Sequence, residues 1–307
     1  MGKSSVRCLL LMAWCGVGLR ADDADAQRRA LAALRELDPI VKVDETESGK
    51  PVVSIQFRPN AGAVTDDDLV HLKAFPSLQC VELPNKSKVT DAGLTHLAAL
   101  DQLEQLNLNG TKVSAAGVVR FVKGRTRLRH LEITGIPLRD DDLAALKELT
   151  ELRVLSLRET LVTDKGAVHL KAFTKLRTIN LSTREGLISD AALPHLKDLT
   201  ALEDLDLDRT AITDAGLEHL KPLRNLRRLQ VAHTAVSDAG LEYLQALSNL
   251  KELNARGTKV TKEGVDKLKQ RLPEIKVGVG PTPTGKWCQE NGVSRKMVSV
   301  RFSSSEK

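Results

Sequence analysis

The sequence predicts an α/β solenoid, in which short parallel strands stack along one side and helices along the other. The first observation behind this prediction is a repeated template, typified by residues 212–231, ITDAGLEHLKPLRNLRRLQV. Successive copies begin 24 to 26 residues apart, at Val64, Val89, Val113, Leu138, Val162, Ile188, Ile212, Val236 and Val260. A fixed period of this length indicates structural units that stack on their neighbours. Two further observations, the hydrophobic periods of the two halves of the template, assign a strand and a helix to each copy.

The second half of each copy predicts a strand. It follows the pattern L-x-x-L-x-L, in which apolar and polar residues alternate as in a strand with one buried face. In copy 6, for example, the apolar positions are Leu202, Leu205 and Leu207. Residues 52–57 fit the same pattern ahead of the first copy, and residues 272–277 complete the last one. About ten parallel strands are therefore expected.

The first half of each copy predicts a helix. It follows T-D-A-G-L-x-x-L-x-x-L, whose leucine spacing places the apolar side chains on one helix face. A Thr or Ser precedes the helix and accepts hydrogen bonds from its first free N–H groups, and the Asp that follows suits the positive helix end. These caps are Thr65, Thr90, Ser114, Thr163, Ser189, Thr213, Ser237 and Thr261. Copy 4 has Arg139 at the cap position, so we expect a weaker helix start there.

These motifs resemble those of a known family. The combination L-x-x-L-x-L-x-x-T and V-T-D-A-G-L resembles a leucine-rich repeat. It is similar to the cysteine-containing class found in F-box substrate receptors and to the V-T-D-A-G-L repeats of many bacterial proteins. The usual Asn after the strand is replaced by Thr at Thr111, Thr160, Thr210, Thr234 and Thr258. The resemblance covers residues 52–277 and implies a right-handed βα horseshoe with about ten parallel strands on its concave face and nine helices on its convex face.

The N-terminal segment has the pattern of a secretory signal peptide. Residues 1–21 combine Lys3 and Arg7 with an apolar run over residues 8–19, which is too short to span a membrane. The alternative is a core helix. We therefore expect a secreted or periplasmic protein, with cleavage after Ala21 or after Ala26.

The rest of the chain divides into three regions. Residues 22–62 are expected to form an N-terminal cap with a helix over 25–37, a strand over 40–43 and the first strand of the solenoid. Residues 63–279 contain the leucine-rich repeats. Residues 280–307 are polar and are predicted to be a disordered tail, although the alternation of Val298, Val300 and Phe302 also allows a short strand that docks on the last repeat.

Charge and cysteine content narrow the classes of partner. The formal charge of +6 belongs to the ends: residues 1–21 contribute +3, and residues 281–307 contribute five basic and two acidic residues, also +3. The repeats between them are near neutral, which argues against a nucleic-acid interface. Of four cysteines, only Cys80 and Cys288 lie outside the expected signal peptide. These are too few for the disulfide-stapled caps typical of eukaryotic extracellular leucine-rich repeats, so a bacterial protein is favoured. We expect a monomer.

No metal, cofactor or catalytic site is predicted. Five histidines share one helix column, but stacked helices lie about 8–10 Å apart, too far for these rings to bind one ion. They are His71, His96, His169, His195 and His219. The sequence contains no G-x-S-x-G, H-E-x-x-H or phosphate-loop motif. A non-enzymatic protein without a cofactor is therefore expected.

The outward positions of the strands offer a candidate binding surface. Asp204, Asp206 and Asp208 alternate with buried leucines and so point the same way, with Arg228 beside Asp204 on the next strand. The hypothesis is an acidic strip that binds a basic partner or a hard cation. The alternative is a solvated strand whose charge Arg228 balances. The candidate partner-binding residues are Asp204, Asp206, Asp208, Arg228, Arg158, Asn180 and Gln230.

Three functions are compatible with this sequence. The first is a protein–protein interaction scaffold that binds its partner on the concave sheet face. The second is an intracellular adaptor of the F-box receptor type, for which a recruiting domain would be expected before the repeats. The third is an enzyme that uses the solenoid as a scaffold, for which no motif was found. We favour the first.

Overall fold

The computed structural model describes residues 21–47, 49–59, 63–183 and 186–280. The strands form one eleven-stranded sheet in which spatial order equals chain order. β1 pairs antiparallel with β2, and each later pair of neighbours is parallel. The strands are β1 (Ile40–Val43), β2 (Val52–Gln56), β3 (Cys80–Glu82), β4 (Gln105–Asn107), β5 (His130–Glu132), β6 (Val154–Ser156), β7 (Thr178–Asn180), β8 (Asp204–Asp206), β9 (Arg228–Gln230), β10 (Glu252–Asn254) and β11 (Lys276–Gly278).

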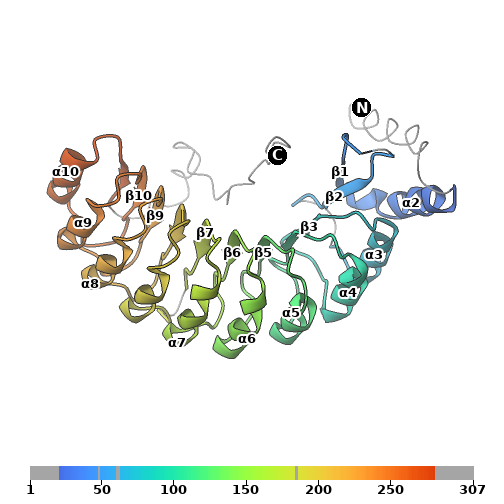
Figure 1. The fold of residues 1–307 in the computed structure, drawn as a ribbon, viewed down its shortest axis with the longest axis horizontal. Helices are drawn as coiled ribbons and strands as arrows, with labels where there is room; N and C mark the ends of the chain where they lie inside the picture. Colours follow the sequence, from blue (N-terminus) through green and yellow to red (C-terminus); the bar gives the residue numbers. More distant parts are fainter. Residues whose placement is uncertain (1–20, 48, 60–62, 184–185, 281–307) are drawn as a thin grey trace.

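The helices form the second layer. Figure 1 shows an arc with the sheet along its inner side and the helices along its outer side, which confirms the predicted horseshoe. The α-helices are α2 (Ala21–Ala33), α3 (Asp66–Val70), α4 (Asp91–His96), α5 (Ala115–Val122), α6 (Asp140–Ala145), α7 (Asp164–Ala167), α8 (Asp214–Leu217), α9 (Asp238–Leu244) and α10 (Lys262–Arg271). The 3₁₀ segments are η1 (Arg35–Leu37), η2 (His71–Ala74), η3 (Leu97–Ala99), η4 (Leu146–Glu148), η5 (Val168–Ala172), η6 (Asp190–Leu196) and η7 (Glu218–Leu220).

The core lies between these two layers and confirms the predicted strand phase. The inward leucines of each strand and the apolar residues of each helix form one continuous buried cluster. On β8, for example, Leu205 is buried, as is Leu207 just after the strand, whereas Asp204 and Asp206 face the concave side. Because each copy exposes its apolar residues at both of its flat ends, only stacking on neighbours removes them from water.

Helix geometry varies among copies for local reasons. Copies 1 to 5 and 7 to 9 begin their helix with an α segment, whereas copy 6 forms the 3₁₀ segment η6 from its start. Pro194 lies inside η6, and proline cannot supply the N–H that an α-helix needs at that point. At copy 4, Arg139 occupies the cap position without a side-chain cap bond, and the side chain of Asp142 accepts from the Arg139 N–H instead; the weaker helix start stays a prediction.

The N-terminal cap differs in its limits from the expected helix over residues 25–37. The α-helix α2 begins at Ala21 and ends at Ala33, and η1 follows as a separate turn. Leu34 between them is fully buried, so packing against the first repeat decides where the helix ends. Nearly all of the predicted signal peptide and of the predicted tail falls outside the described residues. Within the described part of the chain, no helix is both long and apolar enough to cross a membrane.

Candidate partner-binding surface on the concave sheet

Strands β6 to β9 bring the candidate residues together in two rows. Their parallel registers align Thr178, Asp204 and Arg228 in the first row. They align Asn180, Asp206 and Gln230 in the second row. Adjacent strands lie about 4.8 Å apart, so each residue of a row touches its neighbours. Asp208 follows β8 at the end where the strand turns toward the next helix.

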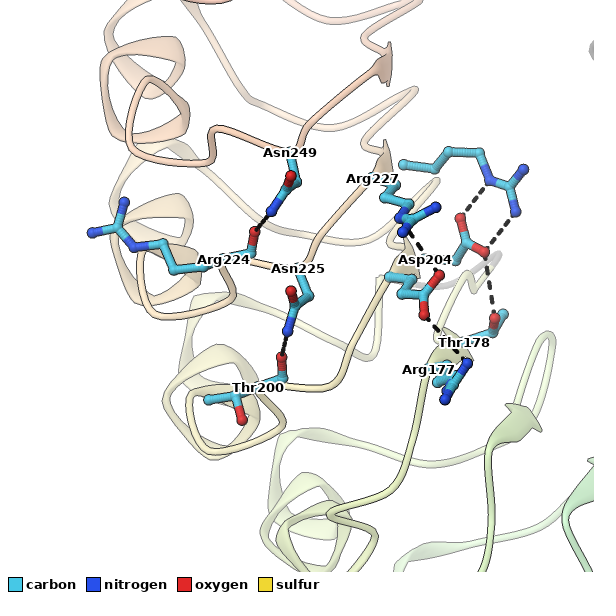
Figure 2. Close-up of polar contacts among 10 residues, drawn as sticks. Arg177, Thr178, Thr200, Asp204, Arg224, Asn225, Arg227 and Asn249 are labelled. Atoms are coloured by element: carbon cyan, nitrogen blue, oxygen red, sulfur yellow. Dashed lines mark hydrogen bonds and ion pairs between the residues drawn. The ribbon is translucent and has the colours of Figure 1, made fainter. Parts of the chain in front are cut away.

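Asp204 is neutralised by Arg228. The guanidinium Nη2 of Arg228 lies 2.6 Å from Asp204 Oδ2, and its Nε also donates to Oδ1 of the same carboxylate. The hydroxyl of Thr178 lies 3.4 Å from Asp204 Oδ2 (Figure 2). The hydrogen bond to Asp204 raises the pKa of Arg228. The expected alternative, charge balance by Arg228, therefore holds for this one carboxylate.

Further ion pairs lie just before the N-terminal ends of strands β7, β8 and β9. Glu203 lies between Arg177 and Arg227, with N···O distances of 3.7 and 3.6 Å, and all three side chains are partly exposed. Figure 2 shows both arginines reaching toward the same carboxylate. Because exposed ion pairs contribute little to stability, we interpret this cluster as solvated surface charge at the N-terminal ends of the strands.

Asp206 has only neutral hydrogen-bond donors among the described residues. Its Oδ2 accepts from the amide Nδ2 of Asn180 at 2.8 Å, and its Oδ1 accepts from the main-chain N–H of Asp208 at 2.9 Å. Burial raises the pKa of Asp206, while these bonds and the charge of Arg158 oppose the increase. Burial disfavours the charged carboxylate because protein atoms replace part of its hydration.

Asp208 is the more strongly perturbed of the two carboxyl groups. Its Oδ1 accepts from the main-chain N–H of Ala232 at 2.7 Å. Burial, followed by the negative charge of Asp206, raises the pKa of Asp208 to about 7. The two neighbouring carboxyls therefore resist simultaneous ionisation near neutral pH.

Asp208→Asn is expected to remove a pH-dependent destabilisation. The pKa of about 7 in the folded state exceeds the ordinary value of 3.8, so the folded state binds this proton more tightly than the unfolded state. Between pH 4 and pH 7 the stability falls as pH rises, and above pH 7 the loss is complete. Asn retains the oxygen that accepts from Ala232. We expect its advantage over wild type to grow from near zero at pH 4 to on the order of 1–2 kcal/mol at pH 8. Three pKa units would give about 4 kcal/mol, but the carboxyl keeps solvent contact.

Urea unfolding at pH 4 and pH 8 measures this difference. The matched control is Asp141→Asn, an exposed carboxyl in the first turn of α6. An advantage of Asp208→Asn that stays the same at both pH values would contradict the raised pKa.

The remaining predicted residues lie around this pair. Arg158, which follows β6, forms an ion pair with Glu159 at 3.0 Å, yet its charge also reaches Asp206 and Asp208. Gln230 is partly exposed beside Asp206. Arg209, which follows Asp208, is exposed and has a left-handed backbone with φ of 61°. This conformation is uncommon for a residue other than glycine, and it lets the Arg209 N–H donate to Ala232 O at 2.8 Å.

The sequence analysis did not single out a second pair of carboxyl groups on the concave face. Glu82 on β3 accepts from Gln56 Nε2 at 3.0 Å, and Glu132 on β5 accepts from Asn107 Nδ2 at 3.1 Å. Burial raises the pKa of both, and the charge of Glu82 adds to the increase at Glu132. The sequence did contain a sign of these sites. In each case an acidic residue aligns with an Asn or Gln on the preceding strand, as Asp206 aligns with Asn180.

No metal centre is formed by the described residues. Within residues 21–47, 49–59, 63–183 and 186–280, no three His, Cys, Asp or Glu side chains are grouped so as to hold a metal ion. Asp206 and Asp208 hold hydrogen bonds from the protein itself, as described above. The chemistry of the surface is therefore that of polar recognition by carboxyl, amide and guanidinium groups.

Comparisons with known proteins support the same fold. A family model described as "Leucine Rich repeat" matches residues 223–244, which is about one copy of the template. No curated protein matches the sequence at a significant level. The solved ectodomain of the Arabidopsis receptor kinase HAESA, in complex with an IDA peptide hormone, matches with a TM-score of 0.57 and 18% identity. That match covers 78% of this chain and 46% of the ectodomain chain.

Two bacterial structures are also similar. Internalin C2 from Listeria monocytogenes matches with a TM-score of 0.49 and 20% identity, over 81% of this chain and 91% of its own. A leucine-rich repeat protein from Leptospira interrogans matches with a TM-score of 0.48 and 17% identity, over 67% of this chain and 56% of its own. The family model is the general repeat, so membership of the cysteine-containing class stays a prediction. The repeated sequence, the solenoid, the family model over one copy and the match to the HAESA ectodomain together show that this chain has the leucine-rich repeat fold.

Proposed function

We propose that this chain is a non-enzymatic scaffold that binds another protein through its concave sheet, with contacts centred on β8. The leucine-rich repeat fold supports a protein partner in general. The concave face and the residues of β8 are the part that we add. We further propose that residues 1–21 are a signal peptide, that the mature protein is secreted or periplasmic, and that residues 22–62 cap the repeats over 63–279.

One observation carries the choice of β8. The carboxyl groups of Asp206 and Asp208 are adjacent, face the concave side, and are held by neutral donors that do not compensate their charge. Both have raised pKa values because of burial, so ionising them costs folding stability. Groups that are unfavourable for the fold in this way are concentrated at functional sites.

The chemistry of this pair favours a basic partner segment. A Lys or Arg side chain from a partner would supply the positive charge that the described neighbours provide only in part, through Arg158 for both carboxyls and Arg209 for Asp208. The ten parallel strands, spaced by about 4.8 Å, form a surface on the order of 45 Å long, enough for an extended segment. Gln230 is partly exposed beside Asp206 and offers an amide group for hydrogen bonds to the main chain of such a segment, whereas Asn180 is buried and holds Asp206 in place.

Replacing both carboxyls is expected to weaken this binding strongly. The double variant Asp206→Asn and Asp208→Asn keeps the shape of both side chains and removes their charge. Each Asn retains one acceptor oxygen, for the main-chain N–H of Asp208 and of Ala232 respectively, whereas the hydrogen bond from Asn180 to position 206 is lost. Loss of a buried charge pair at an interface costs about 2 kcal/mol or more, which is roughly thirtyfold or more in Kd. Urea unfolding of the double variant, measured at the pH of the binding assay, separates weaker binding from loss of the fold.

Phage display of random extended peptides tests the proposal with the full chain as bait. We expect the selected peptides to contain Lys or Arg and to bind more tightly at pH 8 than at pH 5. We also expect the double variant to weaken their binding. The control variant is Asp141→Asn on the convex side, which should bind as the wild type does. Peptides that bind the double variant and the wild type equally would place the binding surface elsewhere.

A further inference from the structure

A series of hydrogen bonds joins the start of each helix to the next copy. The Asp at the first helical position accepts from both the main-chain N–H and the hydroxyl of the Thr or Ser cap in the following copy. In copy 7, Asp214 Oδ1 lies 2.7 Å from Ser237 N, and Oδ2 lies 2.6 Å from Ser237 Oγ. We name this arrangement the Asp–cap bond. It joins Asp66 to Thr90, Asp91 to Ser114, Asp140 to Thr163, Asp164 to Ser189, Asp190 to Thr213, Asp214 to Ser237 and Asp238 to Thr261.

A main-chain bond beside it makes the same connection. Before most copies, the residue just ahead of the copy donates its N–H to the carbonyl of the first residue of the preceding copy. In copy 8, for example, Ala235 N lies 3.1 Å from Ile212 O. The same bond joins Lys88 to Val64, Lys112 to Val89, Leu161 to Leu138, Ala211 to Ile188 and Lys259 to Val236. At copy 6 the corresponding donor, Leu187 N, lies 3.4 Å from Thr183 Oγ1 instead.

The Asp–cap bond and the main-chain bond are both missing between copies 3 and 4. We call this interface the α5–α6 boundary. Ala115 stands at the Asp position of copy 3 and has no carboxylate. Arg139 stands at the cap position of copy 4 and has no hydroxyl. Pro137 stands at the donor position before copy 4 and has no N–H. Three separate substitutions thus remove every hydrogen bond of these two kinds at one boundary.

Copy 4 instead begins in the way that the first copy begins. Arg139 N donates to Asp142 Oδ2 within the same helix turn at 2.9 Å. At the first copy, which has no earlier repeat before it, Thr65 N donates to Asp68 Oδ2 at 2.8 Å. Both copies have three consecutive Asp residues at this point, at 66–68 and 140–142. The start of copy 4 therefore has the chemistry of a terminal repeat.

The glycines of the template confirm that this difference is systematic. Where an Asp–cap bond is present, the third helical position is commonly Gly, because a Cβ there would overlap the incoming Asp side chain. This is the case at Gly93, Gly117, Gly166, Gly216, Gly240 and Gly264. At Asp68 and Asp142 no carboxylate enters from an earlier copy, and the position holds an Asp that binds its own helix start instead.

The sheet stays continuous across the α5–α6 boundary. β5 and β6 pair in the same register as their neighbours, and Gly135 N donates to Arg158 O at 2.8 Å. Thr134 Oγ1 also lies 3.0 Å from Ser156 Oγ on the next strand. The weakness is thus confined to the helix layer, and the sheet would act as the hinge if the helices separated.

We propose that the solenoid consists of two cooperative blocks, residues 21–135 and residues 136–280, which open relative to one another at the α5–α6 boundary. The stability of a repeat protein is approximately the sum of its repeats and of the interfaces between them. An interface with fewer bonds is therefore where cooperativity breaks. The block over residues 21–135 has fewer copies, and it therefore unfolds before the block over residues 136–280.

Native-state hydrogen exchange, followed by mass spectrometry on the full chain, tests this proposal. We expect amides in the helix layer of residues 21–135 to exchange about tenfold or more faster than those of residues 136–280, since one charge-assisted hydrogen bond changes an opening equilibrium by that factor. The change in rate should fall near residue 136. A profile that is continuous through residues 130–145 would overturn the proposal.

A repair variant tests the cause. Ala115→Asp and Arg139→Thr supply the Asp–cap bond, Asp142→Gly makes space for it, and Pro137→Lys restores the main-chain donor. We expect the exchange rates of the two blocks to converge. The matched control, Asp214→Ala with Ser237→Ala, removes an existing Asp–cap bond and should create a second change in rate near residue 235. If the repair variant folds and the difference between blocks persists, the missing bonds are not its cause.

Discussion

Leu205→Ala is expected to lower the free energy of unfolding by about 2–5 kcal/mol, because truncating a buried leucine removes apolar contacts and leaves a cavity. Leu205 lies at the centre of β8 and is 1% exposed. It packs between the inward residues Ile179 and Leu229 of the adjacent strands. These neighbours belong to a stacked array that cannot collapse around the cavity without moving two other copies. A value at the upper part of the range is therefore expected.

Urea unfolding, followed by the far-ultraviolet circular dichroism signal, measures this loss. The matched control is Asp206→Asn on the same strand, one residue away and facing the opposite side. Asp206→Asn removes a charge that burial disfavours but also gives up the hydrogen bond from Asn180, so the control should lower stability by much less than Leu205→Ala does. Unfolding of Leu205→Ala at the wild-type urea concentration would contradict the inward position of Leu205.

Asp214→Ala is expected to lower the free energy of unfolding by about 2–4 kcal/mol. The substitution removes two charge-assisted hydrogen bonds to Ser237, each worth about 1.5–3 kcal/mol, and the Ser237 groups regain part of this through water. It also leaves an unfilled space next to Gly240, whose lack of a side chain accommodates the Asp214 carboxylate. The Asp–cap bond therefore contributes to stability much as a buried contact does.

The control for this prediction is Asp141→Ala. Asp141 also lies in the first turn of a helix, where a carboxylate interacts favourably with the helix dipole, but it is exposed. Its loss should cost about 0.3–1 kcal/mol. Equal losses for Asp141→Ala and Asp214→Ala would show that the bond to Ser237 adds nothing beyond the general effect of charge at a helix start.

The candidate site was only partly predictable from the sequence. Alternation along β8 was sufficient to place Asp204, Asp206 and Asp208 on the same side as one another. It did not reveal that Arg228 neutralises Asp204 while Asp206 and Asp208 keep neutral donors. That division depends on how far each side chain reaches across the sheet and on how deeply it is buried. The similar environments of Glu82 and Glu132 were missed for the same reason.

The α5–α6 boundary gives a second example of this limit. Arg139 was visible in the sequence as a departure from the cap pattern, and a weaker helix start was predicted from it. The sequence contained Ala115 and Pro137 as well, but nothing connected them to Arg139, because they lie twenty-four and two residues away along the chain, respectively. Stacking places all three positions at one interface, where their effects combine.

The sequence by itself determined the solenoid, its strand phase and its helix starts. These depend on periods of two, three and about twenty-four residues, and every copy repeats the same physical requirement that apolar side chains leave water. Only the tertiary structure decided which outward carboxyl groups keep an uncompensated charge and which interface between copies lacks its bonds. Both properties depend on side chains from different copies that meet in space. The pattern within one copy does not predict polar contacts with the neighbouring copy. Hydrophobic burial is largely non-directional, whereas a hydrogen bond or an ion pair requires two particular atoms at a particular distance.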